Sequence, residues 1–362
     1  MGMAKADAEM RRRIGEGQAA GVATAVVSAG EVVEACYGML DVERRVEIQP
    51  DSLMRVYSLT KPVIGVAVML LHEQGSLDLD APVREWIPSF ATLQIGDSSQ
   101  PREALATEIT VRHLLTHTAG LAWGDELLSP IMRLIHPLPT TVELLCRLPL
   151  GFQPGTGWDY SLSFDVLGYL IELVSGRWLA DFLDQEIFIP LGMVDTGFSV
   201  PANAMERFGP LYGRPDGGTF PLIDPTIGSP FADSHEPASG GGGLVSTLRD
   251  YLRFARMLSG GGQLDGVRIL QPGTTQAMAT NQLHGSAFPV RWDWEPGPVD
   301  TLGYGLGLGV SVGEPAKFGW GGASGSKMWI FPDRDLVALA LTHSLFDFTV
   351  ADAFMDALID AD

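Results

Sequence analysis

The stretch Arg55-Val-Tyr-Ser-Leu-Thr-Lys-Pro-Val-Ile-Gly65 decides how the rest of the chain is interpreted. Apolar side chains recur at helical spacing from Val63 to Glu73, which predicts a helix that begins near Ser58. Positions i and i+3 of a helix share a face, so Ser58 and Lys61 are expected to meet at its first turn. Pro62 agrees with this placement, because a residue without an N–H is tolerated within the first turn.

Ser58 and Lys61 together can perform nucleophilic chemistry. A serine hydroxyl is a weak nucleophile until a neighbouring base takes its proton, and a lysine does so when its surroundings favour the neutral amine. Backbone N–H groups at the start of the helix point toward any anion that forms beside Ser58. The alternative interpretation is a helix cap beside a solvated lysine, and the Ser-x-x-Lys spacing alone does not decide between the two.

Three other patterns are interpreted as structural. Ser324-Gly-Ser-Lys327 repeats the Ser-x-x-Lys spacing but leads into a strand-like run, where positions i and i+3 face opposite sides. Gly309-Val-Ser-Val-Gly313 matches the nucleophile elbow of α/β-hydrolases, but that elbow needs a helix after its strand and none is indicated here. His113 and His117 share a helical face, but the glutamate of the HExxH zinc motif is absent.

Composition limits the classes of function. The chain has 362 residues, of which 46% are hydrophobic, so it can bury a large core in one or two domains. A net charge of −20 argues against nucleic acid as a partner. No secretion signal or transmembrane span is indicated, and Cys36 and Cys146 form neither a disulfide framework nor a metal motif. We therefore expect a cytoplasmic protein without a membrane partner, and the oligomeric state stays open.

Strand and helix signals at the two ends of the chain enclose a helical middle. Helices are expected at Ala4 to Gly17, Ile109 to Gly120, Thr140 to Arg147 and Thr349 to Ile359. Strands are expected at Gly21 to Val27, Glu31 to Tyr37, Gly303 to Val312, Lys327 to Phe331 and Leu336 to Thr342. This order predicts an α+β fold, in which an antiparallel sheet flanked by terminal helices is split by a mostly helical domain. The sheet domain would comprise residues 1–80 and 237–362, and the helical domain residues 81–236.

Two further motifs complete a candidate site. Tyr160 follows a turn in Pro154-Gly-Thr-Gly-Trp-Asp-Tyr160 and precedes a helical run. The stretch Phe318-Gly-Trp-Gly-Gly-Ala-Ser-Gly-Ser326 is rich in glycine, which lets a backbone approach a ligand closely. Taken alone, the tyrosine indicates packing and the glycines indicate a bulge. Asp165 is expected to brace the Tyr160 loop by hydrogen bonds.

In this order and at this spacing, the three motifs resemble those of the serine β-lactamase-like superfamily, over nearly the whole chain. The nearest resemblance is to the family VIII carboxylesterases, relatives of class C β-lactamases and D-Ala-D-Ala peptidases, and it implies the β-lactamase-like fold. Further segments that carry it are Leu114-Leu-Thr-His-Thr-Ala-Gly120, Ser239-Gly-Gly-Gly-Gly-Leu-Val-Ser-Thr247 and Gln263-Leu-Asp-Gly-Val-Arg-Ile-Leu270.

The resemblance implies a role for each motif. Ser58 matches the nucleophile that becomes acylated, Lys61 the group that shares its proton, and Tyr160 the general base. The backbone N–H groups of Ser58 and Ala323 match the oxyanion hole. Coupled groups titrate as a pair, so the sequence leaves open which of Lys61 and Tyr160 holds the proton at rest. No metal or organic cofactor is implied.

Two departures from the superfamily pattern indicate the substrate. Trp320-Gly-Gly322 stands where lactamases and peptidases usually carry Lys-Thr-Gly, and an indole cannot form an ion pair with a substrate carboxylate. Tyr160-Ser161-Leu162 replaces the Tyr-x-Asn of class C enzymes, and leucine offers no amide. Both replacements match the pattern of the esterase branch of this superfamily. We therefore predict hydrolysis of neutral, short-chain, small-molecule esters in a pocket lined by Leu162, Trp320, Gly321 and Gly322.

Other functions stay open. β-Lactamase or peptidase-like amide hydrolysis is disfavoured by Trp320 and Leu162, and an inactive binding protein is disfavoured by the intact Ser58, Lys61 and Tyr160. Acyl transfer to an alcohol would need an acceptor pocket, which the sequence does not show. Aromatic residues in loops could line a substrate pocket but indicate packing more readily: Trp123, Trp158, Phe231, Trp292 and Trp294.

Overall fold

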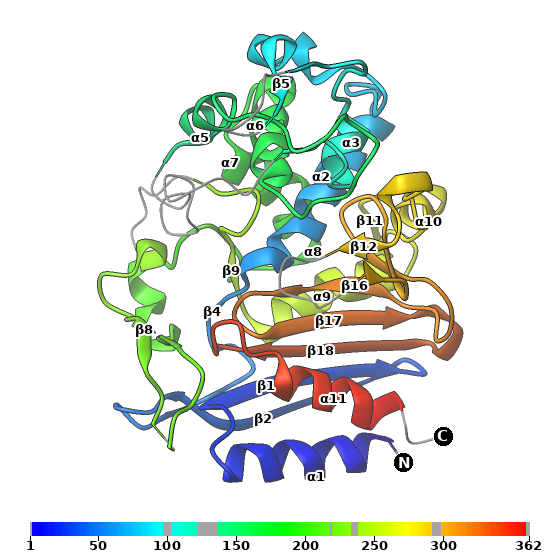
Figure 1. Cartoon of the computed structure of the whole chain (residues 1–362). Helices are drawn as coiled ribbons and strands as arrows, with labels where there is room; N and C mark the ends of the chain where they lie inside the picture. Colours follow the sequence, from blue (N-terminus) through cyan, green and yellow to red (C-terminus); the bar gives the residue numbers. More distant parts are fainter. Residues whose placement is uncertain are drawn as a thin grey trace.

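An eight-stranded antiparallel sheet, drawn from both ends of the described chain, runs through the computed structural model (Figure 1). The structure describes residues 2–96, 103–121, 136–217, 219–232, 238–291 and 298–359. The strand order is β14-β15-β16-β17-β18-β1-β2-β3. The strands are β1 (Gly21–Ser28), β2 (Glu31–Asp41), β3 (Val46–Glu47), β14 (Leu302–Tyr304), β15 (Gly309–Ser311), β16 (Phe318–Gly322), β17 (Ser326–Phe331) and β18 (Leu336–Thr342). The predicted α+β fold is confirmed.

The hairpin of β1 and β2 forms where it was predicted. Its two connecting residues, Ala29 and Gly30, both have positive φ, at 49° and 80°. This is the type I′ geometry, whose twist matches that of the flanking strands. In the adjacent strands β1 and β18, alternate residues face opposite sides of the sheet, so each strand contributes to two separate cores.

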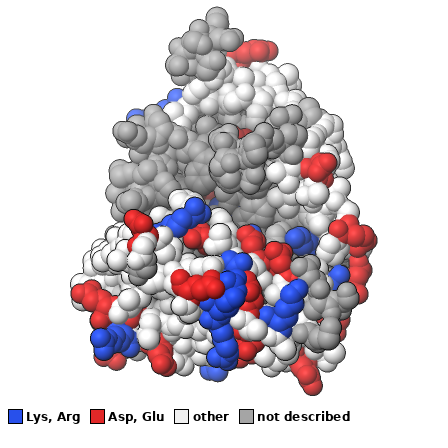
Figure 2. All heavy atoms as spheres, turned by 60° about the horizontal axis from the view of Figure 1, so that its bottom comes forward, with Lys and Arg blue, Asp and Glu red and all other residues white. Residues whose placement is uncertain are grey.

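The terminal helices cover one face of the sheet. Figure 1 shows α1 (Gly2–Gly15) and α11 (Thr349–Ile359) side by side beneath it. Met10 of α1 and Phe354 of α11 share a core with Val22 and Ala338 of the central strands. The outer surface is charged, and Figure 2 shows acidic and basic side chains interspersed on this side of the molecule. The prediction of a sheet flanked by terminal helices is confirmed.

The opposite face of the sheet packs against α9 (Leu248–Ser259) and the helix that follows Ser58, α2 (Thr60–Glu73). Every residue of α2 from Thr60 to Met69 is buried, because the helix lies between the sheet and the helices of the middle segment. These helices are α3 (Val111–Leu115), α5 (Leu138–Leu145), α6 (Ser163–Ser175), α7 (Leu179–Leu183) and α8 (Ile189–Leu191). A domain division at residues 80/81 and 236/237 stays a prediction.

Short elements complete the described chain. They are β4 (Met54–Arg55) paired with β9 (Val245–Ser246), β5 (Gln94–Ile95) with β6 (Glu103–Ala104), β7 (Leu211–Tyr212) with β8 (Leu222–Asp224), β10 (Gln263–Leu264) with β11 (Val267–Arg268), β12 (Val290–Arg291) with β13 (Pro298–Val299), and helix α10 (Pro272–Met278). Within the described ranges, no helix is long and apolar enough to traverse a lipid bilayer.

Two predicted elements differ from the structure. The helix expected from Ile109 to Gly120 is limited to α3, because the chain takes a left-handed turn at His117, where φ is +58°. The single strand expected from Gly303 to Val312 is the hairpin of β14 and β15. Its turn contains Gly307 at φ +87°, and a Cβ on that residue would lie 3.1 Å from the Cα of Gly65 in α2. Glycine therefore permits both the turn and the contact with α2.

Candidate active site

Ser58 lies in a single 3₁₀ turn, Tyr57–Leu59, directly before α2. Lys61 occupies the first turn of the α-helix, and its Nζ donates a hydrogen bond of 3.1 Å to the Ser58 Oγ. The predicted meeting of these two side chains is thus confirmed. Tyr57 has a φ of +45°, which is strained for an aromatic residue, and such strain persists only where the surroundings enforce it. The edge-on contact of Tyr57 with the Phe231 ring, at 5.8 Å, is part of that enforcement.

The Lys61 side chain is buried at the centre of the site, with 1% of the residue exposed. Besides Ser58, its Nζ donates to the Gly241 carbonyl at 2.6 Å. The same atom lies 4.7 Å from the centroid of the Tyr160 ring. The amine therefore contacts both the Ser58 hydroxyl and the ring of Tyr160.

Tyr160 joins the helical segment to the sheet. It lies three positions before α6 and is 7% exposed. Its phenolic oxygen accepts a hydrogen bond of 3.1 Å from the Trp320 Nε1 of β16. The Trp320 ring has room because β15 carries glycine opposite it: a Cβ on Gly309 would lie 2.6 Å from the indole. Tyr160 is therefore approached by the amine of Lys61 and by a neutral donor, Trp320.

The end of β16 lies against the segment that carries Ser58. A Cβ on Gly322 would lie only 2.1 Å from the Val56 carbonyl oxygen, so no other residue permits this approach. Ala323 follows in the turn to β17 and is half-buried, and its carbonyl accepts a hydrogen bond from the Phe346 N–H at 2.7 Å. Ser58 and Ala323 thus lie on adjacent segments. Their role as oxyanion donors stays a prediction.

The remaining residues predicted for the pocket differ in exposure. Gly321 is half-buried and Trp320 is 7% exposed, whereas Leu162 has no exposed surface and packs within the main core. The assignment of these residues to a substrate pocket stays a prediction. The full burial of Leu162 means that only a change in the surrounding core would bring it into contact with a ligand.

Asp165 holds the glycine-rich loop of residues 239–243. Its Oδ1 accepts hydrogen bonds from the Ser239 hydroxyl at 2.6 Å and the Gly241 N–H at 3.3 Å. Bracing of the Tyr160 loop by Asp165 stays a prediction. A Cβ on Gly241 would lie 2.5 Å from Asp165. The loop in turn presents the carbonyl that binds Lys61. Sequence reasoning missed Gly241, although four consecutive glycines were a signal of close backbone approach.

The patterns interpreted as structural have structural partners. The Ser311 hydroxyl accepts from the Lys317 N–H, and β15 leads directly into β16 without the helix that an elbow requires. The Lys327 ammonium pairs with Asp352 of α11 instead of Ser324. His113 Nδ1 accepts from the Thr110 N–H at the start of α3.

His117 and the loop aromatics have separate surroundings. His117 Nδ1 accepts from the Ser161 N–H, so it does not act with His113 as a pair of ligands. Trp158 stacks on Tyr160 with a centroid distance of 6.3 Å, and Phe231 is in a small core. Trp123, Trp292 and Trp294 lie outside the described residues.

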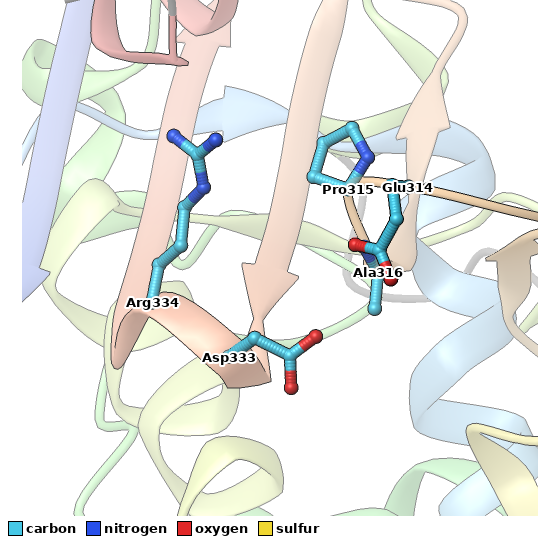
Figure 3. A pocket seen from close by; sticks show the side chains of 5 residues that line it. All are labelled: Glu314, Pro315, Ala316, Asp333 and Arg334. Atoms are coloured by element: carbon cyan, nitrogen blue, oxygen red, sulfur yellow. The ribbon is translucent and has the colours of Figure 1, made fainter. Parts of the chain in front are cut away.

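A surface hollow of about 240 Å³ lies away from these residues (Figure 3). It is lined by Glu314, Pro315, Ala316, Asp333 and Arg334. The loop that contains Glu314 precedes β16, whereas Gly322 ends that strand, so the hollow is at the opposite end of the sheet from Ser58. It shares no residue with the three motifs.

A buried ion pair anchors the segment that precedes Ser58. Arg55 of β4 donates from Nε to Asp224 at 2.6 Å, and its other nitrogens bind the Gly209 carbonyl and the Ser229 hydroxyl. Its guanidinium carbon lies 4.2 Å from the Phe208 ring centroid. Burial lowers the pKa of Arg55, and the Asp224 charge opposes that shift. The pair therefore fixes residues 208–209 and 224–229 against the strand that leads to Ser58.

We expect Asp224→Asn to lower the free energy of unfolding by about 3 kcal/mol, because it leaves the Arg55 charge buried without a counter-charge. Urea unfolding measures this. Asp265→Asn is the matched control: its ion pair with Arg253 is exposed, and we expect a change of at most about 1 kcal/mol. Equal effects of the two substitutions would show that the buried pair has no special role in stability.

Comparison with known proteins places this arrangement in a family. The chain belongs to the Beta-lactamase family, whose model matches residues 6–360. Protein Rv1367c of Mycobacterium tuberculosis is 34% identical over 336 residues, which cover 86% of this chain and 82% of the relative. Esterase EstB of Burkholderia gladioli is 32% identical over 382 residues, with 95% and 91% covered. The fold is that of the serine β-lactamase-like superfamily, which includes esterases.

A solved structure agrees over the same length. EstCE1, described as a hydrolase with promiscuous acyltransferase activity, is 26% identical and superposes with a TM-score of 0.81, covering 99% of this chain and 98% of EstCE1. Together with the family match and the EstB relationship, this identifies the protein as a serine hydrolase. The predicted superfamily and the predicted class of enzyme are confirmed.

Proposed function

We propose that this serine hydrolase is a carboxylesterase that cleaves neutral, short-chain esters through an acyl-enzyme on Ser58. The observation that carries the proposal is the hydrogen bond from Trp320 Nε1 to the Tyr160 oxygen. Trp320 occupies the position where lactamases and peptidases usually carry a lysine. It supplies a donor to the tyrosine but no cation for a substrate carboxylate, which favours uncharged substrates. The names of EstB and EstCE1 agree with ester hydrolysis.

In the proposed reaction, Ser58 Oγ attacks the ester carbonyl carbon while its proton passes to the coupled Lys61 and Tyr160. The negative charge on the carbonyl oxygen is stabilised by the N–H groups of Ser58 and Ala323. The C–O bond to the alcohol breaks, and the leaving oxygen takes the proton from Tyr160. Water then gives a proton to Tyr160 and attacks the acyl-enzyme, which releases the acid and restores the Ser58 hydroxyl.

The proposal is tested by comparing substrates with the wild-type protein. We expect rapid turnover of p-nitrophenyl acetate and butyrate, a decline with longer acyl chains, and little turnover of nitrocefin. The measurement is kcat/KM for each substrate. Nitrocefin turnover above that of every ester would assign the protein to the β-lactamases. It would contradict the inference from Trp320 that the substrate is an uncharged ester.

Acyl transfer is a second candidate, because EstCE1 combines hydrolysis with acyltransferase activity. An alcohol that enters in place of water would accept the acyl group from Ser58. Product analysis of p-nitrophenyl butyrate turnover with added 1-butanol separates the two reactions. Butyrate as the main product supports hydrolysis, whereas butyl butyrate in excess at millimolar alcohol supports a dedicated acyltransferase.

Trp320→Phe tests the neutral donor directly. The substitution keeps an aromatic ring in the edge-on contact with Tyr304, where the centroids are 5.0 Å apart, but removes the N–H that binds Tyr160. We expect kcat for p-nitrophenyl butyrate to fall about tenfold, because the substitution removes one hydrogen bond that holds the oxygen of the base in place. An unchanged kcat would show that the indole N–H does not assist the reaction.

A further inference from the structure

His117 holds the chain on both sides of Tyr160. Its carbonyl oxygen accepts a hydrogen bond of 3.0 Å from the Asp159 N–H. Its ring Nδ1 accepts one of 3.2 Å from the Ser161 N–H and lies 3.3 Å from the Ser161 hydroxyl. The residue is fully buried, and its left-handed backbone turns the ring toward Tyr160. Two neighbours of the tyrosine are thus fixed by one residue from the end of α3.

The His117 ring also packs against the tyrosine itself. The two ring centroids are 4.7 Å apart, and the His117 ring is 5.1 Å from both Phe164 and Tyr304. The Lys61 ammonium approaches the same Tyr160 ring at 4.7 Å. The position of the phenol relative to the lysine therefore depends on the histidine.

The imidazole is a fixed neutral acceptor. Burial and the nearby Lys61 charge hold the pKa of His117 well below its usual range. A neutral ring that accepts at Nδ1 carries its proton on Nε2. Nε2 is buried and has no hydrogen-bond partner in the described part of the chain. If this side chain were needed only for packing, an apolar residue would give a more favourable free energy of folding, because a buried donor without a partner is destabilising.

We propose that His117 is a positioning residue, which holds the phenol of Tyr160 between Lys61 and Trp320 through hydrogen bonds to residues 159 and 161 and through ring contact. This inference rests on the proposed function, in which Tyr160 is the base. The titratable groups that face the phenol are Lys61 of α2, His117 after α3 and Tyr304 of β14. His117 itself takes no proton from the substrate.

The test compares variants that separate the acceptor from the bulk of the ring. His117→Asn keeps an acceptor at the position of Nδ1 and tolerates the left-handed backbone. His117→Gly tolerates that backbone but has no acceptor, and His117→Leu fills the volume without one. His113→Ala is the matched control, because it removes an imidazole that also accepts a backbone N–H through Nδ1, at 3.2 Å, but from Thr110 at the start of α3.

We expect kcat for p-nitrophenyl butyrate to fall about 10²-fold in His117→Gly and His117→Leu, with KM within about threefold of wild type, because a displaced base affects the chemical step. His117→Asn should recover about tenfold of that loss. His113→Ala should keep the wild-type kcat.

The outcomes distinguish this inference from the proposed function. Near-normal kcat in His117→Leu, in a protein where Tyr160→Phe is impaired, would overturn only the positioning role. So would equal losses of kcat in His117→Asn and His117→Leu, which is the result of a purely structural role. Near-normal turnover in Tyr160→Phe would overturn both. If His117→Gly does not fold, the comparison of the Asn and Leu variants gives the same decision.

Discussion

Ser58→Ala is expected to lower kcat/KM for p-nitrophenyl butyrate by about 10⁴-fold or more, because it removes the atom that forms the acyl-enzyme. The Ser58 hydroxyl is half-buried, and its contact with Lys61 is the nucleophile–base geometry that the mechanism needs. Steady-state kinetics measures the loss. Mass spectrometry with a fluorophosphonate probe should show one covalent adduct on the wild-type protein and none on the variant.

Ser311→Ala is the control for the Ser58 experiment. Ser311 belongs to the Gly-x-Ser-x-Gly sequence, but its hydroxyl accepts a backbone hydrogen bond from Lys317 within a β-hairpin. We expect its kinetic constants to equal those of the wild type. A loss of activity in Ser311→Ala with retention in Ser58→Ala would reverse the assignment of the nucleophile.

Tyr160→Phe is expected to lower kcat by about 10³-fold, within the range that general acid–base catalysis contributes. The ring contacts with His117, Trp158 and Trp320 would remain, so the loss would report the hydroxyl alone. Acylation and deacylation should both slow, because the proposed mechanism uses the tyrosine in each step. Pre-steady-state release of p-nitrophenol separates the two rates.

The matched control for Tyr160 is Tyr304→Phe. Tyr304 packs against the Trp320 ring, but its own hydroxyl is buried without a hydrogen-bond partner among the described residues. Burial raises the pKa of Tyr304 well above its usual value, and the nearby Tyr160 adds to that shift, so this phenol stays neutral. We expect kcat within about threefold of wild type. If the two tyrosine variants lose activity equally, the hydroxyl of Tyr160 has no special function.

The sequence predicts those parts of the fold whose signals are local. The spacing of apolar residues defines α11, and the Ala29-Gly30 turn defines the first hairpin. Ser58 and Lys61 meet because helical geometry alone brings positions i and i+3 together. Sheet-like and helical stretches alternate clearly enough to indicate the α+β class. In each case, the evidence comes from residues that are neighbours in the sequence.

The parts that sequence reasoning missed depend on contacts between distant segments. Gly241 binds Lys61 because Asp165 fixes its loop, and neither residue is near Lys61 in the sequence. The sequence predicts a continuous helix through His117. Helical periodicity does not show that the side chain of this residue lies beside Tyr160. The sequence predicts one strand across Gly307 and Gly309, because local alternation does not show that Gly307 turns against α2 and that Gly309 admits the Trp320 ring.

The pairing of β1 with β18 sets the earliest stage of synthesis at which the sheet can close. Val22 pairs with Thr342, so the centre of the sheet closes only after the chain has been translated past residue 342. Until then, the first hairpin has an open edge, which can pair with other chains. Contacts this distant in sequence also slow folding, since a very long loop must close before they form. Gly322 approaches the segment beside Ser58 as part of the same sheet, so we expect enzymatic activity to appear only after this sheet has formed.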